Sequence, residues 1–231
     1  MIASKENFLS GEIILIDKPL DWTSFQVVNK IRWIIKSTYG IKKIKVGHAG
    51  TLDPLATGLL IICTGKMTKS IEQFMGQEKE YTGTFTLGAT TPSYDLETPI
   101  NMEFPIDHID EEMLQATLSK FIGTIDQQPP VFSALKKDGK RLYEYAREGT
   151  QVEVPHRKVN IHDFNLTQID LPNVDFRVSS SKGTYIRSLA NDFGKALNSG
   201  AYLTGLRRTR IGDFNIEKAL SIEGFEDLLQ N

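Results

Sequence analysis

The chain has 231 residues, of which 40% are hydrophobic and 24% charged, and its formal net charge is −2. These values lie near the averages of globular proteins, and the length allows a full hydrophobic core. The single cysteine excludes a disulfide framework and a cysteine-rich zinc site. No stretch resembles a signal peptide or a membrane span, so we expect a cytoplasmic protein.

Charge is unevenly distributed along the chain. Residues 95–112 contain seven acids and no lysine or arginine, whereas residues 136–158 contain seven bases and four acids. Three further arginines lie together in "LRRTR" (206–210). Such segregation can create an anion-binding face although the net charge is slightly negative. The alternative is a set of ordinary solvated faces.

The predicted elements follow from hydrophobic periodicity and from capping residues. In chain order they are a strand (11–17), a helix (23–40), strands (58–65 and 79–88), a helix (110–123), strands (152–166 and 174–181), a helix (184–197), a long strand (201–215) and a short helix (222–230). A basic, proline-rich segment at about 127–155 interrupts this pattern and predicts a mobile inserted arm with a short helix. Because strands and helices do not alternate strictly, the sequence predicts an α+β fold with a mixed, largely antiparallel sheet.

The common cofactor and metal motifs are missing from the sequence. There is no P-loop, no G-x-G-x-x-G fingerprint, no H-E-x-x-H and no G-x-S-x-G. The four histidines have no metal-ligand spacing. We therefore expect chemistry from carboxylate, tyrosine and arginine side chains, with no cofactor and no metal.

The stretch "VGHAGTLDPLATGLL" (46–60) presents one carboxylate, Asp53. Pro54 forces Asp53 into an extended conformation, and the glycines before it permit tight turns. An ordinary Asp-Pro turn is the alternative interpretation. In "SKGTYIRS" (181–188), Tyr185 and Arg187 are predicted to project from the first turn of a helix, with Thr184 as its cap. An arginine beside a carboxylate keeps it ionised and orients it.

Six motifs in order resemble the bacterial tRNA pseudouridine synthase B family over residues 10–212. They are "LIDKPLDWTSFQVVNKIR", "GHAGTLDPLATGLL", "KEYTGTFTLG", "QQPPVFSALKKDGKRLYEYAREG", "SSSKGTYIRSLANDFG" and "YLTGLRRTRIG". The resemblance implies the pseudouridine synthase fold, with helices flanking the sheet and a central RNA-binding cleft. It also implies that uridine 55 in the TΨC arm of tRNA is flipped out and isomerised to pseudouridine.

The resemblance also implies roles for individual residues. Asp53 is the catalytic carboxylate, which either forms a covalent adduct or assists a glycal route. Tyr81 stacks on the flipped base and takes part in proton transfer, and Arg187 pairs with Asp53. The remaining substrate-binding residues are His48, Tyr185, Asp95, Leu206, Arg207 and Arg208, and Lys18 and Pro19 shape the floor of the site. The basic arm (136–158) is expected to supply phosphate contacts together with Arg207, Arg208 and Arg210.

Two departures from the family pattern affect these expectations. The chain ends 19 residues after Gly212, so we expect a single catalytic domain (1–231) without the C-terminal PUA-type domain that many members carry. The segment 91–95 keeps a T-x-S-x-D version of the usual T-x-T-x-D, but it lacks the glycine that often follows, which weakens the case for a substrate contact from Asp95. The expected partner is tRNA, bound by a monomer. Two alternatives stay open, a guide-dependent rRNA pseudouridylase and a non-catalytic tRNA-binding module.

Overall fold

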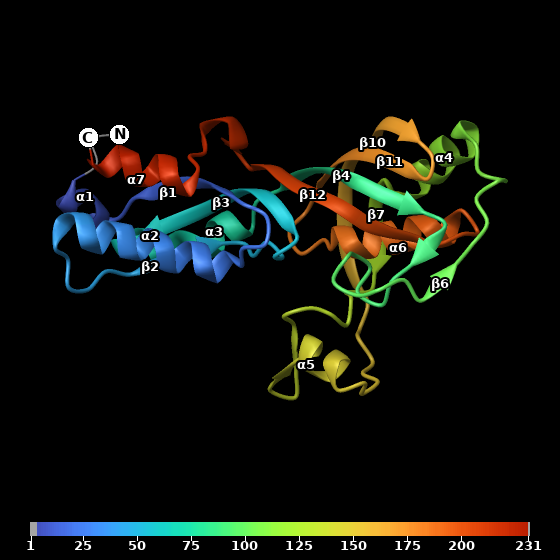
Figure 1. Cartoon of the computed structure of the whole chain (residues 1–231), viewed down its shortest axis with the longest axis horizontal. Helices are drawn as coiled ribbons and strands as arrows, with labels where there is room; N and C mark the ends of the chain where they lie inside the picture. The colour runs from blue at the N-terminus through green and yellow to red at the C-terminus, as the bar shows by residue number, and fades with distance from the viewer. Residues whose placement is uncertain (1–3, 231) are drawn as a thin grey trace. The chain divides into compact units, whose positions relative to one another are not determined.

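The computed structural model describes residues 4–230, which form two compact units. Of these described residues, unit 1 comprises 4–81 and 206–230, and unit 2 comprises 82–205. Two strands, β4 (Lys79–Leu87) and β12 (Ala201–Ile211), begin in one unit and end in the other. Both units contain sheet strands with helices packed on them (Figure 1), which confirms the predicted α+β fold.

The sheet of unit 1 is built around β3 (Ala56–Thr64). Strands β1 (Ile13–Lys18) and β2 (Val46–Ala49) pair with β3 in antiparallel register. The second half of β12 pairs with the start of β3 in parallel, with Leu206 opposite Ala56. A short hairpin then joins β12 to β13 (Phe214–Asn215). Leu206 therefore lies beside the strand that follows the Asp53 loop.

Helices cover both faces of this sheet. They are α1 (Lys5–Ser10), α2 (Ser24–Tyr39), α3 (Ile71–Met75) and α7 (Ile222–Gln230), with 3₁₀ turns η1 (Gly65–Ser70) and η3 (Ile216–Lys218). Leu60 and Ile62 of β3 pack with α2 and α7, whereas Leu59, Ile61 and Cys63 point into a second core with α3. Burial on both faces explains why the run "LLIIC" is continuously apolar.

The long helix α2 follows its sequence signals closely. Thr23 and Gln26 form a capping box, and Gly40 ends the helix in the left-handed conformation at φ 62°. The predicted stripe is fully buried in the core: Val27, Val28, Ile31, Ile34 and Ile35. Here local capping chemistry and hydrophobic periodicity specify the same element, and both predictions are confirmed.

Unit 2 has the strand order β12-β4-β11-β10-β7, with β7 (Gly123–Gln127), β10 (Arg157–Asp170) and β11 (Asn173–Ser180). Its helices are α4 (Glu111–Leu118), continued by η2 (Ser119–Phe121), and α6 (Ile186–Ala196). Strands β5 (Ala89–Thr90) and β6 (Met102–Glu103) form a separate hairpin. Phe193 of α6 packs on Phe85 and Phe164 of the sheet at 5.9 Å between ring centroids, which fixes the helix that carries Arg187.

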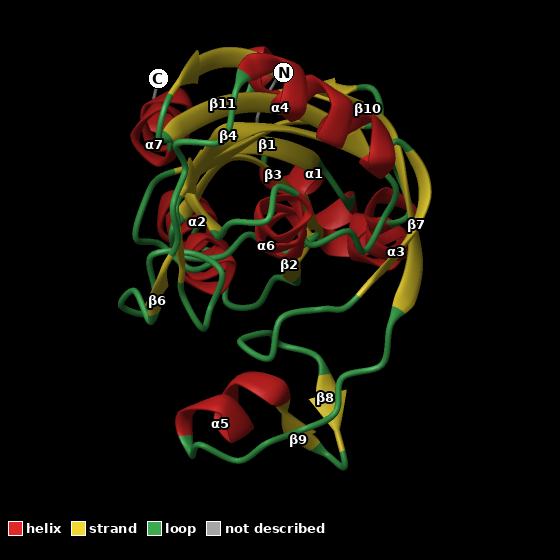
Figure 2. Ribbon diagram, turned by 90° about the vertical axis from the view of Figure 1, so that its right-hand side faces the viewer, coloured by secondary structure: helices red, strands yellow, loops and turns green. Residues whose placement is uncertain are grey.

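The basic arm leaves unit 2 between β7 and β10. It contains a small hairpin, β8 (Lys136–Lys137) with β9 (Lys140–Arg141), and the helix α5 (Leu142–Arg147). Figure 2 shows these elements lying apart from the strands of the sheet. The short helix predicted in this segment is therefore present. Within residues 4–230, no helix is both long and apolar enough to span a bilayer.

Candidate active site

The loop that carries Asp53 is fastened on both sides of the half-buried carboxylate. On one side, the Leu52 N–H donates to Ser24 Oγ (2.9 Å), and the Ser24 hydroxyl donates to the Leu52 carbonyl (3.1 Å). On the other side, the Asp21 N–H donates to the Pro54 carbonyl (2.9 Å). Hydrogen bonds of Leu52 and Pro54 thus hold the backbone on either side of Asp53.

Lys18 supports the same loop from below the surface. Its side chain is fully buried, and Nζ donates to the carbonyls of Trp22 (2.6 Å), Pro19 (2.8 Å) and Pro54 (3.3 Å). Burial lowers the pKa of Lys18 to about 8, although the Asp53 carboxylate opposes this shift. The Asp53 carboxylate therefore lies close enough to Lys18 to favour its charged form.

Arg208 holds the first half of the loop, and the prediction that it contacts phosphate is wrong because its side chain is buried. Only 1% of its surface is exposed, and its guanidinium donates to the carbonyls of Leu59 (2.8 Å), Gly50 (3.0 Å) and Thr51 (3.5 Å). Gly50 has a φ of 96°, which only glycine adopts without strain. Burial, and then the charge of Arg208, lower the pKa of His48, so His48 is neutral near pH 7.

The other predicted residues of unit 1 are more accessible or lie on β4. Arg207 makes a two-pronged ion pair with Asp17, Nη1–Oδ1 3.0 Å and Nη2–Oδ2 2.6 Å, and its side chain is 41% exposed. Leu206 is half-buried, and Tyr81 is buried near the start of β4. Unit 1 therefore gathers Asp53, Lys18, His48, Leu206 and the two arginines around one loop and its neighbouring strands.

In unit 2, Arg187 is inside the protein and not on a surface helix face. It is 4% exposed, its Nε lies 3.6 Å from Asp95 Oδ2, and Nη1 donates to the Ser93 carbonyl (3.2 Å). Asp95 is also buried, and its Oδ1 accepts from the Glu97 N–H (2.9 Å). The threonine and serine of the T-x-S-x-D motif donate to the Asp95 carbonyl, Thr91 Oγ1 at 2.7 Å and Ser93 Oγ at 3.3 Å. The pairing of Arg187 with Asp53 stays a prediction.

Tyr185 is held through its backbone by Gln127, a residue that the sequence analysis missed. The Tyr185 N–H donates to Gln127 Oε1 (2.8 Å), and Gln127 Nε2 donates to the Tyr185 carbonyl (3.1 Å). Tyr185 is the N-cap of α6, so the prediction that Thr184 caps the helix is wrong. Thr184 donates to the Ser181 carbonyl instead (3.0 Å). The guanidinium of Arg157 lies 4.6 Å from the Tyr185 ring centroid.

Replacing Gln127 by alanine tests whether this contact positions Tyr185. The Tyr185 N–H then loses its acceptor at the start of α6, whereas the Tyr185 carbonyl keeps the Leu189 N–H (3.1 Å), and the loss costs about 1–3 kcal/mol of unfolding free energy. We expect turnover to slow about tenfold or more, whereas Gln128→Ala slows it less. Urea unfolding and single-turnover rates measure the two effects, and equal rates for the two variants would contradict the assignment.

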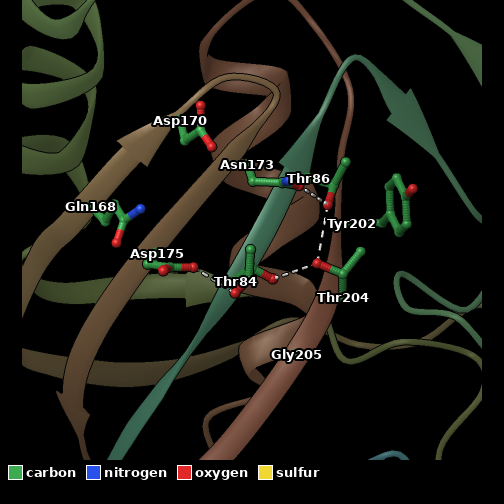
Figure 3. Close-up of a pocket in the computed structure, with 9 residues that line it drawn as sticks. All are labelled: Thr84, Thr86, Gln168, Asp170, Asn173, Asp175, Tyr202, Thr204 and Gly205. Carbon is green, nitrogen blue, oxygen red and sulfur yellow. Dashed lines mark hydrogen bonds between the residues drawn. The ribbon is translucent and has the colours of Figure 1, made fainter.

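A separate polar hollow of about 610 Å³ lies in unit 2 and contains none of the predicted site residues. Its walls are polar side chains of neighbouring strands together with Gly205: Thr84, Thr86, Gln168, Asp170, Asn173, Asp175, Tyr202 and Thr204. Hydrogen bonds link Thr84 to Asp175 (2.6 Å) and Thr86 to Thr204 (3.0 Å), as Figure 3 shows. Five of these side chains form hydrogen bonds with one another: Thr84, Thr86, Asn173, Asp175 and Thr204. Within residues 4–230, no three His, Cys, Asp or Glu side chains are grouped as metal ligands.

Comparison with protein-family models identifies the family of this chain. The family model described as "TruB family pseudouridylate synthase (N terminal domain)" matches residues 36–186, and the "tRNA pseudouridylate synthase B C-terminal domain" matches residues 187–231. The chain belongs to the TruB family. The family resemblance predicted from six motifs is confirmed.

Individual TruB relatives match over almost their whole length. The chain is 61% identical to "tRNA pseudouridine synthase B" of Flavobacterium johnsoniae, over 97% of this chain and 99% of the relative. It is 57% identical to the protein of the same name from Phocaeicola vulgatus, over 96% and 95% of the two chains.

A solved structure shows the same fold. A chain in the crystal structure of a Cbf5-Nop10-Gar1 complex matches with a TM-score of 0.72 and 28% identity, over 96% of this chain. This chain spans 55% of that one. The likeness confirms the predicted pseudouridine synthase fold.

Proposed function

We propose that this TruB protein isomerises uridine 55 in the TΨC arm of tRNA to pseudouridine. The observation that carries the proposal is the 61% identity to a tRNA pseudouridine synthase B over 99% of that relative. The fastened Asp53 loop supports it, because binding alone does not require a carboxylate held on both sides. We also propose that the chain acts as a cytoplasmic monomer and as one catalytic domain, without cofactor or metal.

The reaction rearranges bonds and leaves the atomic composition unchanged. The bond from N1 of the base to C1′ of the ribose breaks, a bond from C5 to C1′ forms, C5 loses a proton and N1 gains one. We assign the cleavage of the N1–C1′ bond to Asp53. Its carboxylate either adds covalently to the sugar or base, or assists the formation of a glycal intermediate. A fixed backbone around Asp53 reduces the entropy cost of reaching the reactive geometry.

The base must leave the RNA stack before it reaches Asp53. Flipping costs a few kcal/mol, which stacking and contacts to the base edge repay. We assign Tyr81 to stacking and proton transfer, Tyr185 and Leu206 to the walls of the base pocket, and His48 to the point where the nucleotide leaves the stack. Because His48 is neutral, it offers hydrogen bonding and stacking without a charge.

The arginines of the proposed site have two kinds of role: some contact RNA, and others position catalytic groups. Arg207, whose side chain is more exposed than that of Arg208, is assigned to a phosphate contact. The lysines and arginines of the arm at 136–158 are assigned the same role. Arg208, bonded to three loop carbonyls, is assigned to positioning of the Asp53 loop. Arg187 is assigned to orienting Asp53, and Asp95 holds Arg187.

The guide-dependent alternative has less support. The chain in the Cbf5-Nop10-Gar1 complex is 28% identical, and nearly half of its length has no counterpart in the match. By contrast, the bacterial tRNA enzymes match along nearly their whole length at much higher identity.

One incubation tests the proposal. Purified protein is mixed with an unmodified tRNA transcript, without guide RNA, partner protein, cofactor or metal, and pseudouridine is mapped by nucleotide. We expect modification at position 55 and no modification of a transcript whose position 55 is cytidine. No pseudouridine at position 55 would refute the proposal, and pseudouridine formed only after adding a guide RNA would favour the alternative.

The rate is expected to fall as the pH rises through about 8. Lys18, with its pKa lowered to about 8, then loses its positive charge beside Asp53 and keeps two hydrogens for three carbonyl acceptors. The pKa of Lys18 is lower in the folded chain than the ordinary value of 10.5. The unfolded chain therefore binds more protons between these two pH values, and folding becomes more favourable as the pH rises from about 8 to 10.5. The decline is therefore not explained by Lys18-driven unfolding.

Single-turnover rates from pH 6.5 to 9.5 measure this decline. In Lys18→Arg, whose guanidinium keeps its proton throughout, the alkaline limb is expected to disappear. A wild-type rate that is flat to pH 9.5, at constant tRNA binding, would contradict the role of Lys18.

A further inference from the structure

Arg157 differs from a solvated base of the segment at 136–158, because its side chain is partly enclosed by unit 2. The residue is half-buried, and its Nε is buried without a hydrogen-bond partner. Within residues 4–230, Arg157 forms no ion pair with an acid. An acidic partner therefore does not explain where its positive charge lies.

An aromatic ring takes the place of that partner. The Cζ atom of Arg157 lies 4.6 Å from the ring centroid of Tyr185, within the roughly 6 Å at which a cation is attracted to an aromatic ring. A Cβ at Gly183 would lie 3.5 Å from Cζ and 3.7 Å from both Nη atoms, so Gly183 lies over the flat face of the guanidinium. Gly183 has a φ of 83°, which glycine adopts without strain. The turn before Tyr185 therefore packs directly on Arg157.

The sheet register places Arg157 beside the residue that holds the Tyr185 backbone. Arg157 is the first residue of β10, and it pairs with Gln127 of β7 in antiparallel register. Gln127 bonds to both the N–H and the carbonyl of Tyr185. One cross-strand pair therefore contacts Tyr185 at its backbone and at its ring.

The turn that leads into Tyr185 is fastened to the same strand. The Ser181 N–H donates to the Asn160 carbonyl (2.8 Å), and the Asn160 N–H donates to Ser181 Oγ (2.9 Å). The backbone from Ser181 to Tyr185 is thus held at both ends. The Tyr185 hydroxyl, by contrast, forms no hydrogen bond with any residue that the structure describes. Arg157 therefore provides the polar contact that orients this ring.

We propose that Arg157 is a positioning residue that holds the Tyr185 ring at a fixed angle in the base pocket. The inference rests on the proposed function, in which Tyr185 forms a wall of that pocket. It also separates Arg157 from the other bases at 136–158, because a guanidinium packed on Tyr185 and Gly183 serves the protein and not a phosphate. A ring with a fixed orientation lowers the entropy cost of reaching the reactive geometry. The loss of Arg157 should therefore lower the rate and leave the affinity unchanged.

Arg157→Met tests this assignment, because it removes the charge and keeps an unbranched side chain. The single-turnover rate at saturating tRNA should fall about tenfold. The affinity for a tRNA transcript should stay within about twofold, and its salt dependence should not change. Arg157→Lys keeps a cation for the ring and should retain the rate within about threefold. Arg177→Met removes the same charge from an exposed arginine of the same unit and should keep the wild-type values.

A double-variant comparison shows whether Arg157 acts through the ring. Tyr185→Leu removes the ring, so adding Arg157→Met to it should slow the reaction less than about twofold further. Equal effects of Arg157→Met with and without the ring would overturn the proposal. A log–log salt slope that is shallower by about 0.7–0.9, with an unchanged saturating rate, would also overturn it and make Arg157 a phosphate contact.

A measurement without turnover separates this inference from the proposed function. 3-Fluorotyrosine is incorporated at position 185, and its ¹⁹F resonance is recorded without RNA, under conditions in which urea unfolding shows each variant to be folded. Arg157→Met should shift and broaden the resonance, whereas Arg177→Met should not. An unchanged resonance in Arg157→Met would overturn the proposal. A wild-type protein that forms no pseudouridine would refute the proposed function, whereas the ¹⁹F comparison would still decide whether Arg157 holds the ring.

Discussion

Asp53→Asn is expected to slow pseudouridine formation by at least about 10³-fold, because asparagine can neither add to the substrate nor accept a proton. The substitution preserves shape, and both neighbours of Asp53 keep their backbone hydrogen bonds to Ser24 and Asp21. We therefore expect tRNA affinity to fall less than about tenfold. The loss of a negative charge beside Lys18 should lower the pKa of Lys18 further, since Asp53 now raises it.

Single-turnover kinetics and equilibrium binding on the same transcript separate these effects. Asp213→Asn, at an exposed turn of the same unit, removes the same charge away from the loop and should retain wild-type rate. Residual turnover of Asp53→Asn near the wild-type rate would refute the assignment of Asp53. An equal loss of rate and affinity would indicate a binding role.

Elements whose local signals agree with their packing could be predicted from the sequence. Helix α2 has a capping box, a terminal glycine and an apolar stripe, and all three were visible in order. Helix α6 was found by its apolar face, although its N-cap is Tyr185 and not Thr184. The basic arm stood out through its prolines and charges.

Short strands were missed because their sequences show no alternation. Strand β2 (Val46–Ala49) contains one glycine, Gly47, buries only its two end residues, and exists because β3 pairs with it. Strand β7 (Gly123–Gln127) exposes two of its five residues and is fixed by pairing with β10. In both cases a long-range partner decides the structure, and a window of neighbouring residues cannot show that partner.

The same limit applies to the site. Asp53 was predicted because Pro54 and two glycines mark it locally. The burial of Arg208 and the contact of Gln127 with Tyr185 depend on residues far away in sequence. The residue type alone therefore does not predict the role of Arg208 or of Gln127. The three arginines of "LRRTR" look alike in the sequence. In the structure Arg208 is buried, whereas the Arg207 side chain is 41% exposed, because successive residues of a strand point to opposite faces.

Arg187→Lys is expected to lower kcat by at least about 10²-fold although the charge is conserved. The guanidinium contacts Asp95 through Nε and the Ser93 carbonyl through Nη1, and one ammonium group cannot occupy both positions. An ammonium group is also more strongly hydrated in water than a guanidinium, so it costs more to bury. The unfolding free energy should therefore fall by about 1–3 kcal/mol.

Arg177→Lys is the matched control, because Arg177 is an exposed arginine of the same unit that pairs with Asp163 at 3.5 Å. It should keep the wild-type rate and stability, since exposed ion pairs contribute little. The decisive measurement is kcat at saturating tRNA together with urea unfolding. If Arg187→Lys loses stability but keeps kcat, Arg187 serves the fold alone; if kcat falls at temperatures where the variant is fully folded, the planar geometry of Arg187 serves the reaction.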